Sequence, residues 1–421
     1  MIKNLLFIRI LLAIALGLSL VGCPEGGAAD PATRIHIADK YTVEGGVEIT
    51  QPQHLLNNQY ILFNKAEQNV SGLAFNMQEG KLSWEISLFP DSNGNYYVTQ
   101  SSYYTFVWPS FSRKGELVVI DPRNGYTVFQ ISNSELQKGA LAVSSGIAAT
   151  ESHIYALTGR SGIAVFDLDP DSHFPSFSHK ISIPDIKDYG PNPQLYYAET
   201  IAKDPNSNDV FIGTYSVYEY GNVPDLYRID TDTGEIKWKA NVEYSDNGED
   251  AIAGRFAGHV SSITLTRDVL VVQAGQSVQA FDPDTGERYW YYELRCHGEV
   301  PGDITQSQLF VPETGRVYFG RGSDYCYYSV SANKINPDPW SLDTQAYPYG
   351  ATPQRGLPTY LNGIIYFFNG FIWAVDPYTG RPLGVSKNIL WYGVNISIFN
   401  DGRYIYVPTP DAIYAFEPVR K

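Results

Sequence analysis

The feature that most constrains the fold of this chain is a short pattern that recurs along it. In the clearest copy, strand-forming residues 278–281 precede Asp282, Gly286 follows four positions later, and Trp290 follows after four more. Alternating residues of this kind predict a β-strand. Asp can accept hydrogen bonds from the backbone just after it, and Gly tolerates a positive φ, so the next residues predict a tight turn. We expect each copy to form a hairpin whose aromatic residue packs toward the neighbouring unit.

Five copies of the pattern are clear, and in four of them an aromatic residue follows the Gly. Their predicted turn residues are Asn76, Gly80, Trp84, Asp121, Gly125, Asp230, Gly234, Trp238, Asp282, Gly286, Trp290, Asp376 and Gly380. Three weaker copies end at Asp167, Ser331 and Glu417, and the first of them has lost the Gly. Successive copies lie 41 to 63 residues apart. That period is typical of four-stranded propeller blades.

A second pair of strand-forming segments precedes each hairpin, which gives about four strands per unit. One such sheet cannot bury both of its faces, whereas a closed ring of sheets can. We therefore predict an all-β protein, a monomeric eight-bladed β-propeller of four-stranded antiparallel blades. A seven-bladed ring is the alternative, because the third and sixth copies are degenerate. The last copy stops where its outer strand should begin, and we expect residues 33–42 to supply that strand.

The N-terminus has the features of a secretory signal. Lys3 and Arg9 precede the apolar residues 10–21, and Gly22 and Cys23 follow. This apolar run is shorter than the ~20 residues that span a bilayer. Residues 20–23 resemble a bacterial lipobox, which implies cleavage before Cys23 and lipid attachment to it. The alternative is an ordinary secretory signal with a cysteine nearby by chance.

With a lipobox at residues 20–23, the chain is predicted to comprise a signal peptide (1–22), a lipidated flexible tether (23–32) and a propeller closed by its N-terminal strand (33–421). Pro24 rather than Asp follows the cysteine. By resemblance to lipoprotein sorting, Pro24 favours the outer membrane, with the propeller facing the periplasm. The opposite orientation stays open.

Charge and cysteine content narrow the possible partners. The net charge of −15 does not favour binding to nucleic acid. Besides Cys23, the chain has only Cys296 and Cys326. In an exported protein such a pair predicts a disulfide, and two buried thiols are the alternative.

The AxDxxTGxxxW pattern resembles the repeat of PQQ-like β-propellers, and Ala280, Asp282, Thr285, Gly286 and Trp290 carry it best. One branch of that family comprises quinoprotein dehydrogenases, and another comprises BamB-type lipoproteins, which are scaffolds in outer-membrane protein assembly. The lipobox, tether and blade number resemble the second branch more closely. This resemblance implies a non-enzymatic scaffold that binds protein partners of the cell envelope, including barrel-assembly machinery.

Motifs for catalysis are not evident in the sequence. There is no pair of adjacent cysteines, as quinoprotein dehydrogenases carry, and no HExxH or GxSxG motif. The acidic positions 167, 169 and 171 favour a solvated turn over a calcium loop. We therefore expect no catalytic residue, cofactor or metal. A ligand-binding or enzymatic propeller, quinone-dependent or directed at glycans, is the alternative.

Aromatic residues in long inter-strand segments are the candidate binding residues. Long aromatic loops on a rigid scaffold commonly form binding surfaces. The alternative is that these tyrosines pack between blades. The candidate binding loops contain Trp108, Tyr189, Tyr215, Tyr218, Tyr220 and Tyr349.

Overall fold

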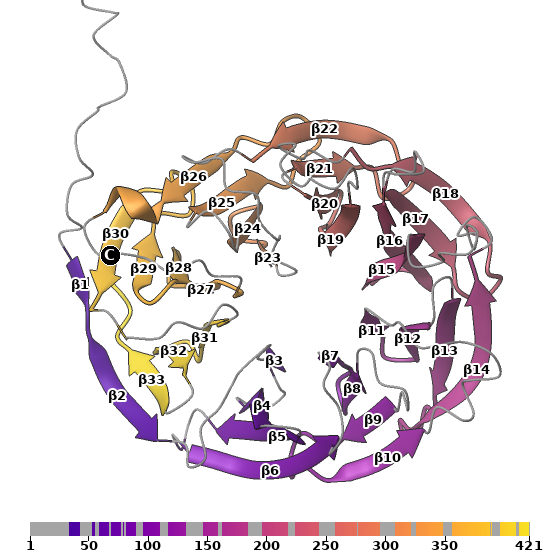
Figure 1. The fold of residues 1–421 in the computed structure, drawn as a ribbon, viewed down its shortest axis with the longest axis horizontal. Coiled ribbons are helices and arrows are strands. Elements are labelled where there is room, and N and C mark those ends of the chain that lie inside the picture. Colours follow the sequence, from indigo (N-terminus) through magenta and orange to yellow (C-terminus); the bar gives the residue numbers. More distant parts are fainter. Residues whose placement is uncertain are drawn as a thin grey trace, which may run out of the picture.

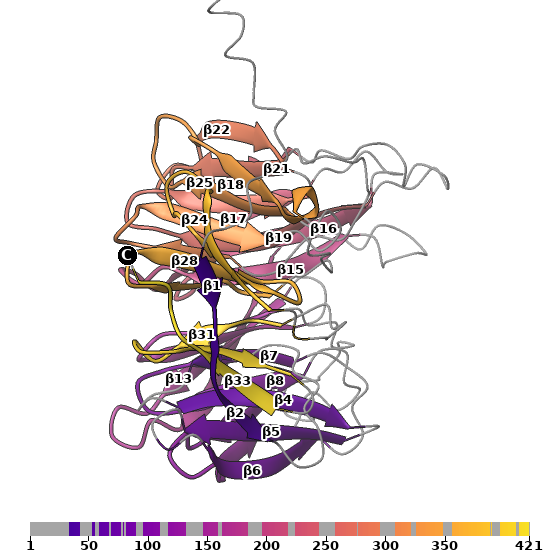
Figure 2. The ribbon, with the colours of Figure 1, turned by 90° about the vertical axis from the view of Figure 1, so that its left-hand side faces the viewer.

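The computed structural model shows an eight-bladed β-propeller, viewed along the ring in Figure 1 and edge-on in Figure 2. The predicted all-β fold and the count of eight blades are confirmed. The structure describes residues 33–42, 53–54, 59–66, 69–76, 79, 81–89, 96–109, 117–131, 146–158, 162–183, 196–217, 224–243, 257–275, 277–294, 308–320, 326–347, 356–387, 389, 396–409 and 412–420.

Each blade is a four-stranded antiparallel sheet, and the first four blades occupy the N-terminal half of the chain. Blade 1 contains β3 (Gln53–His54), β4 (Gln59–Ala66), β5 (Asn69–Asn76) and β6 (Lys81–Phe89). Blade 2 contains β7 (Tyr96–Gln100), β8 (Thr105–Pro109), β9 (Leu117–Ile120) and β10 (Thr127–Ile131). Blade 3 contains β11 (Ile147–Ala149), β12 (His153–Thr158), β13 (Gly162–Leu168) and β14 (Pro175–Ser182). Blade 4 contains β15 (Tyr196–Lys203), β16 (Asp209–Val217), β17 (Asp225–Asp230) and β18 (Ile236–Asn241).

The remaining four blades complete the ring. Blade 5 contains β19 (Ala257–Leu265), β20 (Leu270–Ala274), β21 (Ser277–Phe281) and β22 (Arg288–Glu293). Blade 6 contains β23 (Leu309–Val311), β24 (Arg316–Gly320), β25 (Cys326–Ser331) and β26 (Trp340–Asp343), followed by the short 3-10 helix η4 (Thr344–Ala346). Blade 7 contains β27 (Thr359–Leu361), β28 (Ile364–Phe368), β29 (Ile372–Val375) and β30 (Pro382–Ser386). Blade 8 contains β31 (Phe399–Asn400), β32 (Ile405–Pro408) and β33 (Ala412–Phe416), and its outer strand comes from the N-terminus.

The N-terminal strands join the two ends of the chain. β2 (Ile37–Thr42) pairs antiparallel with β33 and so forms the outer strand of blade 8. β1 (Thr33–Ile35) pairs in parallel with β30 and adds a fifth strand to blade 7. The first described residues of the chain therefore bind two different blades on the circumference of the ring (Figure 1).

The hydrophobic core lies between the blades. One cluster joins Tyr155 and Val165 of blade 3 to Ile212 and Tyr227 of blade 4, and the described parts of other neighbouring blades share clusters of the same kind. Sheets in the described part of the ring, such as those of blades 4 and 5, are therefore covered on both faces, as a ring requires. Within the part of the chain that the structure describes, no helix has the length and apolar character needed to cross a membrane.

The predicted turns have the expected geometry where the structure describes them. In blade 5, the Asp282 carboxylate accepts hydrogen bonds from the backbone N–H groups of Asp284 and Thr285, and Gly286 has a φ of 73°. Gly125, Gly234 and Gly380 have φ values between 71° and 77°. Gly80 lies outside the described residues.

The third turn lies two residues beyond the predicted position. The ladder between β13 and β14 continues through Asp167 and Leu168, so the turn begins at Asp169 rather than Asp167. Asp169 accepts hydrogen bonds from the backbone of Asp171 and Ser172, and His173 occupies the position of the usual Gly with a φ of 58°. The predicted position was two residues too early because the length of a hairpin depends on which residues of its strands pair, and the local pattern does not contain that information.

Candidate functional site

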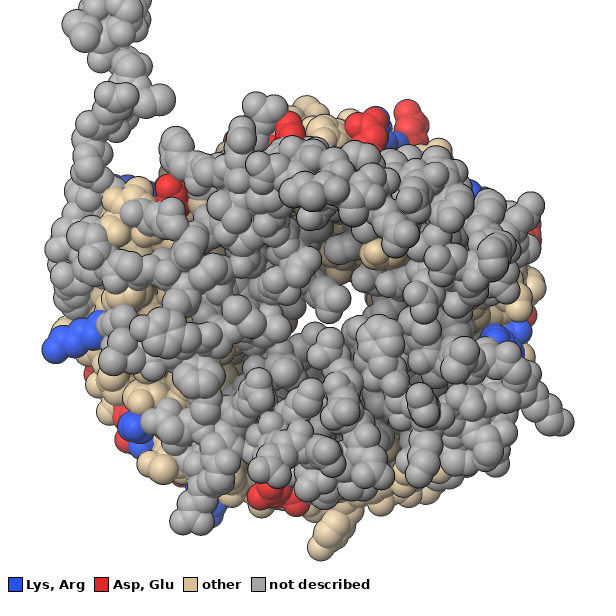
Figure 3. All heavy atoms as spheres, in the orientation of Figure 1, with Lys and Arg blue, Asp and Glu red and all other residues tan. Residues whose placement is uncertain are grey.

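The propeller has two faces that differ in how the chain crosses them. On one face, tight turns connect the first strand of a blade to the second and the third to the fourth; we call it the turn face. On the other, the chain passes from blade to blade; we call it the loop face, and it is toward the viewer in Figures 1 and 3. In Figure 3 the visible described charged side chains lie around the circumference.

Tryptophan side chains join neighbouring blades near the turn face. The indole Nε1 of Trp238 in blade 4 donates a hydrogen bond to the Pro283 carbonyl in blade 5, at 3.0 Å. Trp84 and Trp340 make the same contact with the blades that follow them. Because the Trp238 ring lies against Gly286, a Cβ at Gly286 would stand 2.7 Å from it. Gly125, Gly286 and Gly380 are therefore needed both for their positive φ and for this close approach of a tryptophan ring.

Two of these junction residues are not apparent in the predicted pattern. Trp340 is opposite Ser329, just as Trp238 is opposite Arg228, but it follows an irregular turn. His179 is opposite Val165 and contacts the Thr231 carbonyl through Nε2 at 2.8 Å. An imidazole thus replaces the indole between blades 3 and 4.

Blades 4 and 5 form one eight-stranded sheet. The last residues of β16 pair with both β15 and β19, and Tyr215 is opposite Tyr197 on one side and His259 on the other. β15 and β16 reach toward the loop face in Figure 2. We call blades 4 and 5 together the double blade.

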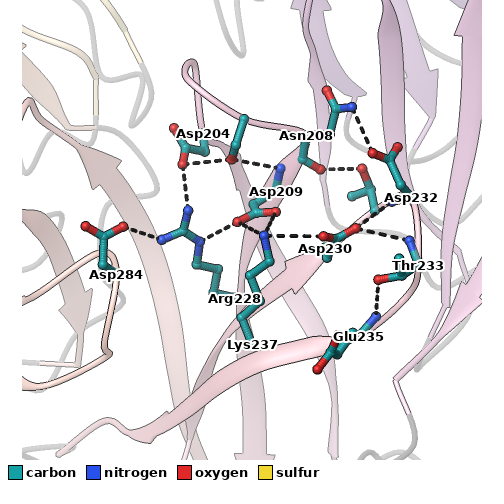
Figure 4. Close-up of polar contacts among 12 residues, drawn as sticks. Asp204, Asn208, Asp209, Arg228, Asp230, Asp232, Thr233, Glu235, Lys237 and Asp284 are labelled. Carbon is teal, nitrogen blue, oxygen red and sulfur yellow. Dashed lines mark hydrogen bonds and ion pairs between the residues drawn. The ribbon is translucent and has the colours of Figure 1, made fainter.

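A buried charge network holds the double blade together at its other end (Figure 4). Arg228 Nε donates to Asp209 at 2.6 Å and Nη2 to Asp204 at 3.1 Å, both in blade 4. Its Nη1 crosses to blade 5 and donates to the Asp284 carboxylate at 2.7 Å. The Asp209 side chain is 2% exposed and also binds Lys237 Nζ, at 2.7 Å. Arg228 therefore satisfies buried carboxylates and links two blades.

Charge pairing also sets the protonation of this network. Burial disfavours the charged guanidinium, but hydrogen bonds to Asp284 and Asp209 outweigh it, so the pKa of Arg228 lies above its usual value. The hydrogen bond to Asp209 raises the pKa of Lys237. Both cations stay charged at neutral pH.

Arg228 was not identified from the sequence as a functional residue. It occupies the position two residues before the repeat Asp, where Ala74 and Ala280 stand in other copies. A charged side chain at a position that is otherwise small and apolar is the signal that could have revealed it. Its partners, which extend from Asp204 to Asp284, are brought together only by the fold.

The predicted binding residues do not all lie in loops. Trp108 is in β8 and Tyr215 is in β16, so for these two the loop assignment was wrong: strand pairing extends through both positions. Tyr189, Tyr218, Tyr220 and Tyr349 lie outside the described residues. Tyr215 is half-buried at the loop-face end of the double blade.

Cys326 is 1% exposed in β25 and takes part in a disulfide. Cys296 and Cys23 lie outside the described residues, so the Cys296–Cys326 pairing and the lipid site stay predictions. Among the residues that the structure describes, no three His, Cys, Asp or Glu side chains are grouped so that they could hold a metal ion.

The turn geometry and the inter-blade tryptophans define a propeller of the PQQ-like repeat type, and comparisons with known proteins confirm this prediction. A family model described as "Outer membrane protein assembly factor BamB" matches residues 208–332, which contain most of the double blade and of blade 6. A search of curated proteins finds no match.

Solved structures share the fold at low sequence identity. BamB from Moraxella catarrhalis is 13% identical with a TM-score of 0.56, over 91% of this chain and 100% of that one. The quinohemoprotein alcohol dehydrogenase from Comamonas testosteroni is 12% identical with a TM-score of 0.61, over 93% and 78%. A europium-containing methanol dehydrogenase is 11% identical with a TM-score of 0.54, over 91% and 93%.

Proposed function

We propose that this protein is a non-enzymatic binding scaffold that docks protein partners during outer-membrane protein assembly. The observation that carries this proposal is the family match, which covers residues 208–332 and so contains most of the double blade. At the loop face, β16 pairs with both β15 and β19, and a backbone that is already ordered loses little entropy when a partner binds.

The partner site in this proposal is the loop-face end of the double blade, around Tyr215. A photo-crosslinking amino acid at position 215 should capture envelope proteins in living cells, and mass spectrometry would identify them. Tyr378, which is 57% exposed on the turn face of blade 7, is the matched control position. Capture of outer-membrane assembly proteins from position 215 and not from 378 supports the proposal. The same partners from both positions, or none from 215, would contradict it.

We further propose that Cys23 carries a lipid that holds the propeller at the outer membrane, facing the periplasm. This proposal rests on the lipobox-like residues 20–23 and on the location of β1 at the circumference of the ring. Cys23→Ser should release the chain from the membrane fraction, while the circular dichroism spectrum stays unchanged. Retention of the variant in membranes would rule out this anchor.

The dehydrogenase-like structures suggest a test of the non-enzymatic assignment. Purified protein mixed with PQQ and calcium should show no saturable change in absorbance and no dye-linked alcohol oxidation. A stoichiometric spectral change with turnover would make the chain an enzyme and overturn this part of the proposal.

A further inference from the structure

Exposed aromatic side chains gather on the turn face where blades 2 and 3 meet. Tyr103 is 50% exposed and Phe174 is 37% exposed, and Tyr126 in the next turn is 71% exposed. Isolated apolar residues on a surface are normal, whereas a group of them marks a site of interaction. We call Tyr103, Tyr104, His173 and Phe174 the aromatic patch.

The rings of the patch are held in fixed positions across the junction. Tyr103 and His173 stack with ring centroids 3.5 Å apart and planes inclined by 10°. Tyr104 and Phe174 stack at 5.7 Å. The Tyr104 hydroxyl also donates to the Ser172 carbonyl at 3.4 Å. The patch is thus preorganised, because its rings are already ordered before any partner arrives.

His173 has a backbone conformation that histidine rarely adopts. Four other repeats place Gly at this position of the turn, and His173 takes nearly the same φ, 58°, with a side chain attached. A non-glycine residue in this region is strained, because its Cβ comes too close to the neighbouring backbone. This conformation brings the His173 ring over Tyr103 at the surface. Strained residues of this kind are enriched at functional sites.

Carboxylates surround the patch and indicate the charge of its partner. Asp171 is exposed in the same turn as His173, and the exposed Glu151 accepts a hydrogen bond from Ser102, next to Tyr103. The nearby Arg123 is neutralised by Asp121, whose carboxylate it contacts at 2.7 Å. Aromatic ring faces attract cations, and carboxylates beside them strengthen that attraction.

We propose that the aromatic patch is a docking site for a positively charged, arginine- or lysine-bearing segment of a protein partner. The guanidinium or ammonium groups would contact the ring faces of the patch, and the neighbouring carboxylates would pair with the same charges. This surface lies on the face opposite Tyr215, so it and the proposed loop-face site can fail independently.

The test uses the purified full-length chain in detergent and a fluorescent peptide that carries four arginines separated by Gly-Ser pairs. Anisotropy should show saturable binding that weakens as salt increases. His173→Gly restores the usual turn residue and removes one ring, and Tyr103→Ser removes the other. Each variant should weaken binding by about fivefold, since exposed cation–π contacts are of that size. His173→Gly should leave Tm unchanged or raise it.

Tyr378→Ser is the matched control, because it removes an equally exposed ring from the turn face of blade 7. It should not change binding. The proposal is overturned if His173→Gly and Tyr103→Ser bind as tightly as the original chain, or if Tyr378→Ser weakens binding to the same extent. It is also overturned if a neutral chitin oligosaccharide binds at the patch and the arginine peptide does not, since the surface would then recognise glycans.

Discussion

Two junctions of the ring, between blades 4 and 5 and between blades 2 and 3, are built from the same repeat. They differ in the contacts that join the blades at the turn face. Between blades 4 and 5, Arg228 bridges buried carboxylates and Trp238 donates to the next turn. Between blades 2 and 3, the residue opposite Val119 is Phe129, at the position that Trp238 takes in blade 4. There the contacts at the surface include Tyr103 with His173 and Ser102 with Glu151.

The difference shows how a repeat architecture can separate stability from recognition. At the turn face, the charged groups of the junction between blades 4 and 5 are paired with one another across the two blades. The junction between blades 2 and 3 has aromatic rings and carboxylates at its surface, and these remain available to a partner. Four experiments test this difference between the junctions, in decreasing order of the expected change.

Removing Arg228 should cause the largest loss of stability. Arg228→Met leaves Asp204 and Asp209 buried beside an apolar side chain, and breaking a buried ion pair from one side costs about 3–5 kcal/mol. Urea unfolding of the variant would measure this change. Arg123→Met is the control: Arg123 also pairs with a buried carboxylate, Asp121, but its own side chain is 69% exposed, so the loss should be smaller because water can replace part of the contact. Equal losses in both variants would show that the double blade does not depend on its buried charges.

Substituting the turn glycine should be the next largest effect. Gly286→Ala places a methyl group 2.7 Å from the Trp238 ring and forces alanine into a positive φ. We expect a loss of about 2–3 kcal/mol in unfolding free energy. Gly315→Ala is the matched control, since Gly315 has a φ of 64° with open space around its Cβ position, and only the conformational cost of ~1 kcal/mol should remain. If both variants lose the same amount, the ring contact contributes nothing.

Removing a single indole hydrogen bond should have a smaller effect. Trp238→Phe keeps an aromatic ring but removes the bond to the Pro283 carbonyl, which should cost about 1 kcal/mol. Trp340→Phe loses the equivalent bond to Pro377 and should cost a similar amount in the same calorimetric measurement. An unchanged Tm in both variants would mean that ring packing alone joins the blades.

Acidification should have the smallest effect per residue. The side-chain hydrogen bond from Arg123 lowers the pKa of Asp121. Burial opposes ionisation of Asp282, but hydrogen bonds from Tyr289 and the turn backbone outweigh it, so the pKa of Asp282 is also lowered. The pKa of Asp in an unfolded chain is about 3.9, so ionised Asp121 and Asp282 stabilise the fold above about pH 4. That contribution is lost as the pH falls through their lower pKa values in the folded protein.

Thermal unfolding between pH 7 and pH 3 would check this sign. Tm should fall on acidification, and Asp282→Asn should flatten part of that fall. A Tm that rises as the pH decreases would contradict the assignment of both carboxylates.

The ring could be predicted from the sequence because each copy of the repeat is recognised from residues that are close together in the chain. The Asp282 turn can be predicted from residues that contact one another within five positions, and the period of the copies then sets the number of blades. The displacement of the third turn to Asp169 and the parallel pairing of β1 could not be predicted in this way, since both depend on which strands meet. The same holds for the Arg228 network, in which Arg228 binds Asp284, 56 residues further along the chain.

The pairing of β2 with β33 has a consequence for the order in which the molecule is completed. Ile37 lies opposite Phe416, so β2 pairs with a strand that is synthesised long after it. Contacts of such large sequence separation form slowly, because a long loop must close before they are gained. Blade 8 is therefore completed only after both β2 and β33 have been synthesised, and a chain truncated before β33 is left with unpaired strand edges at both sides of the gap.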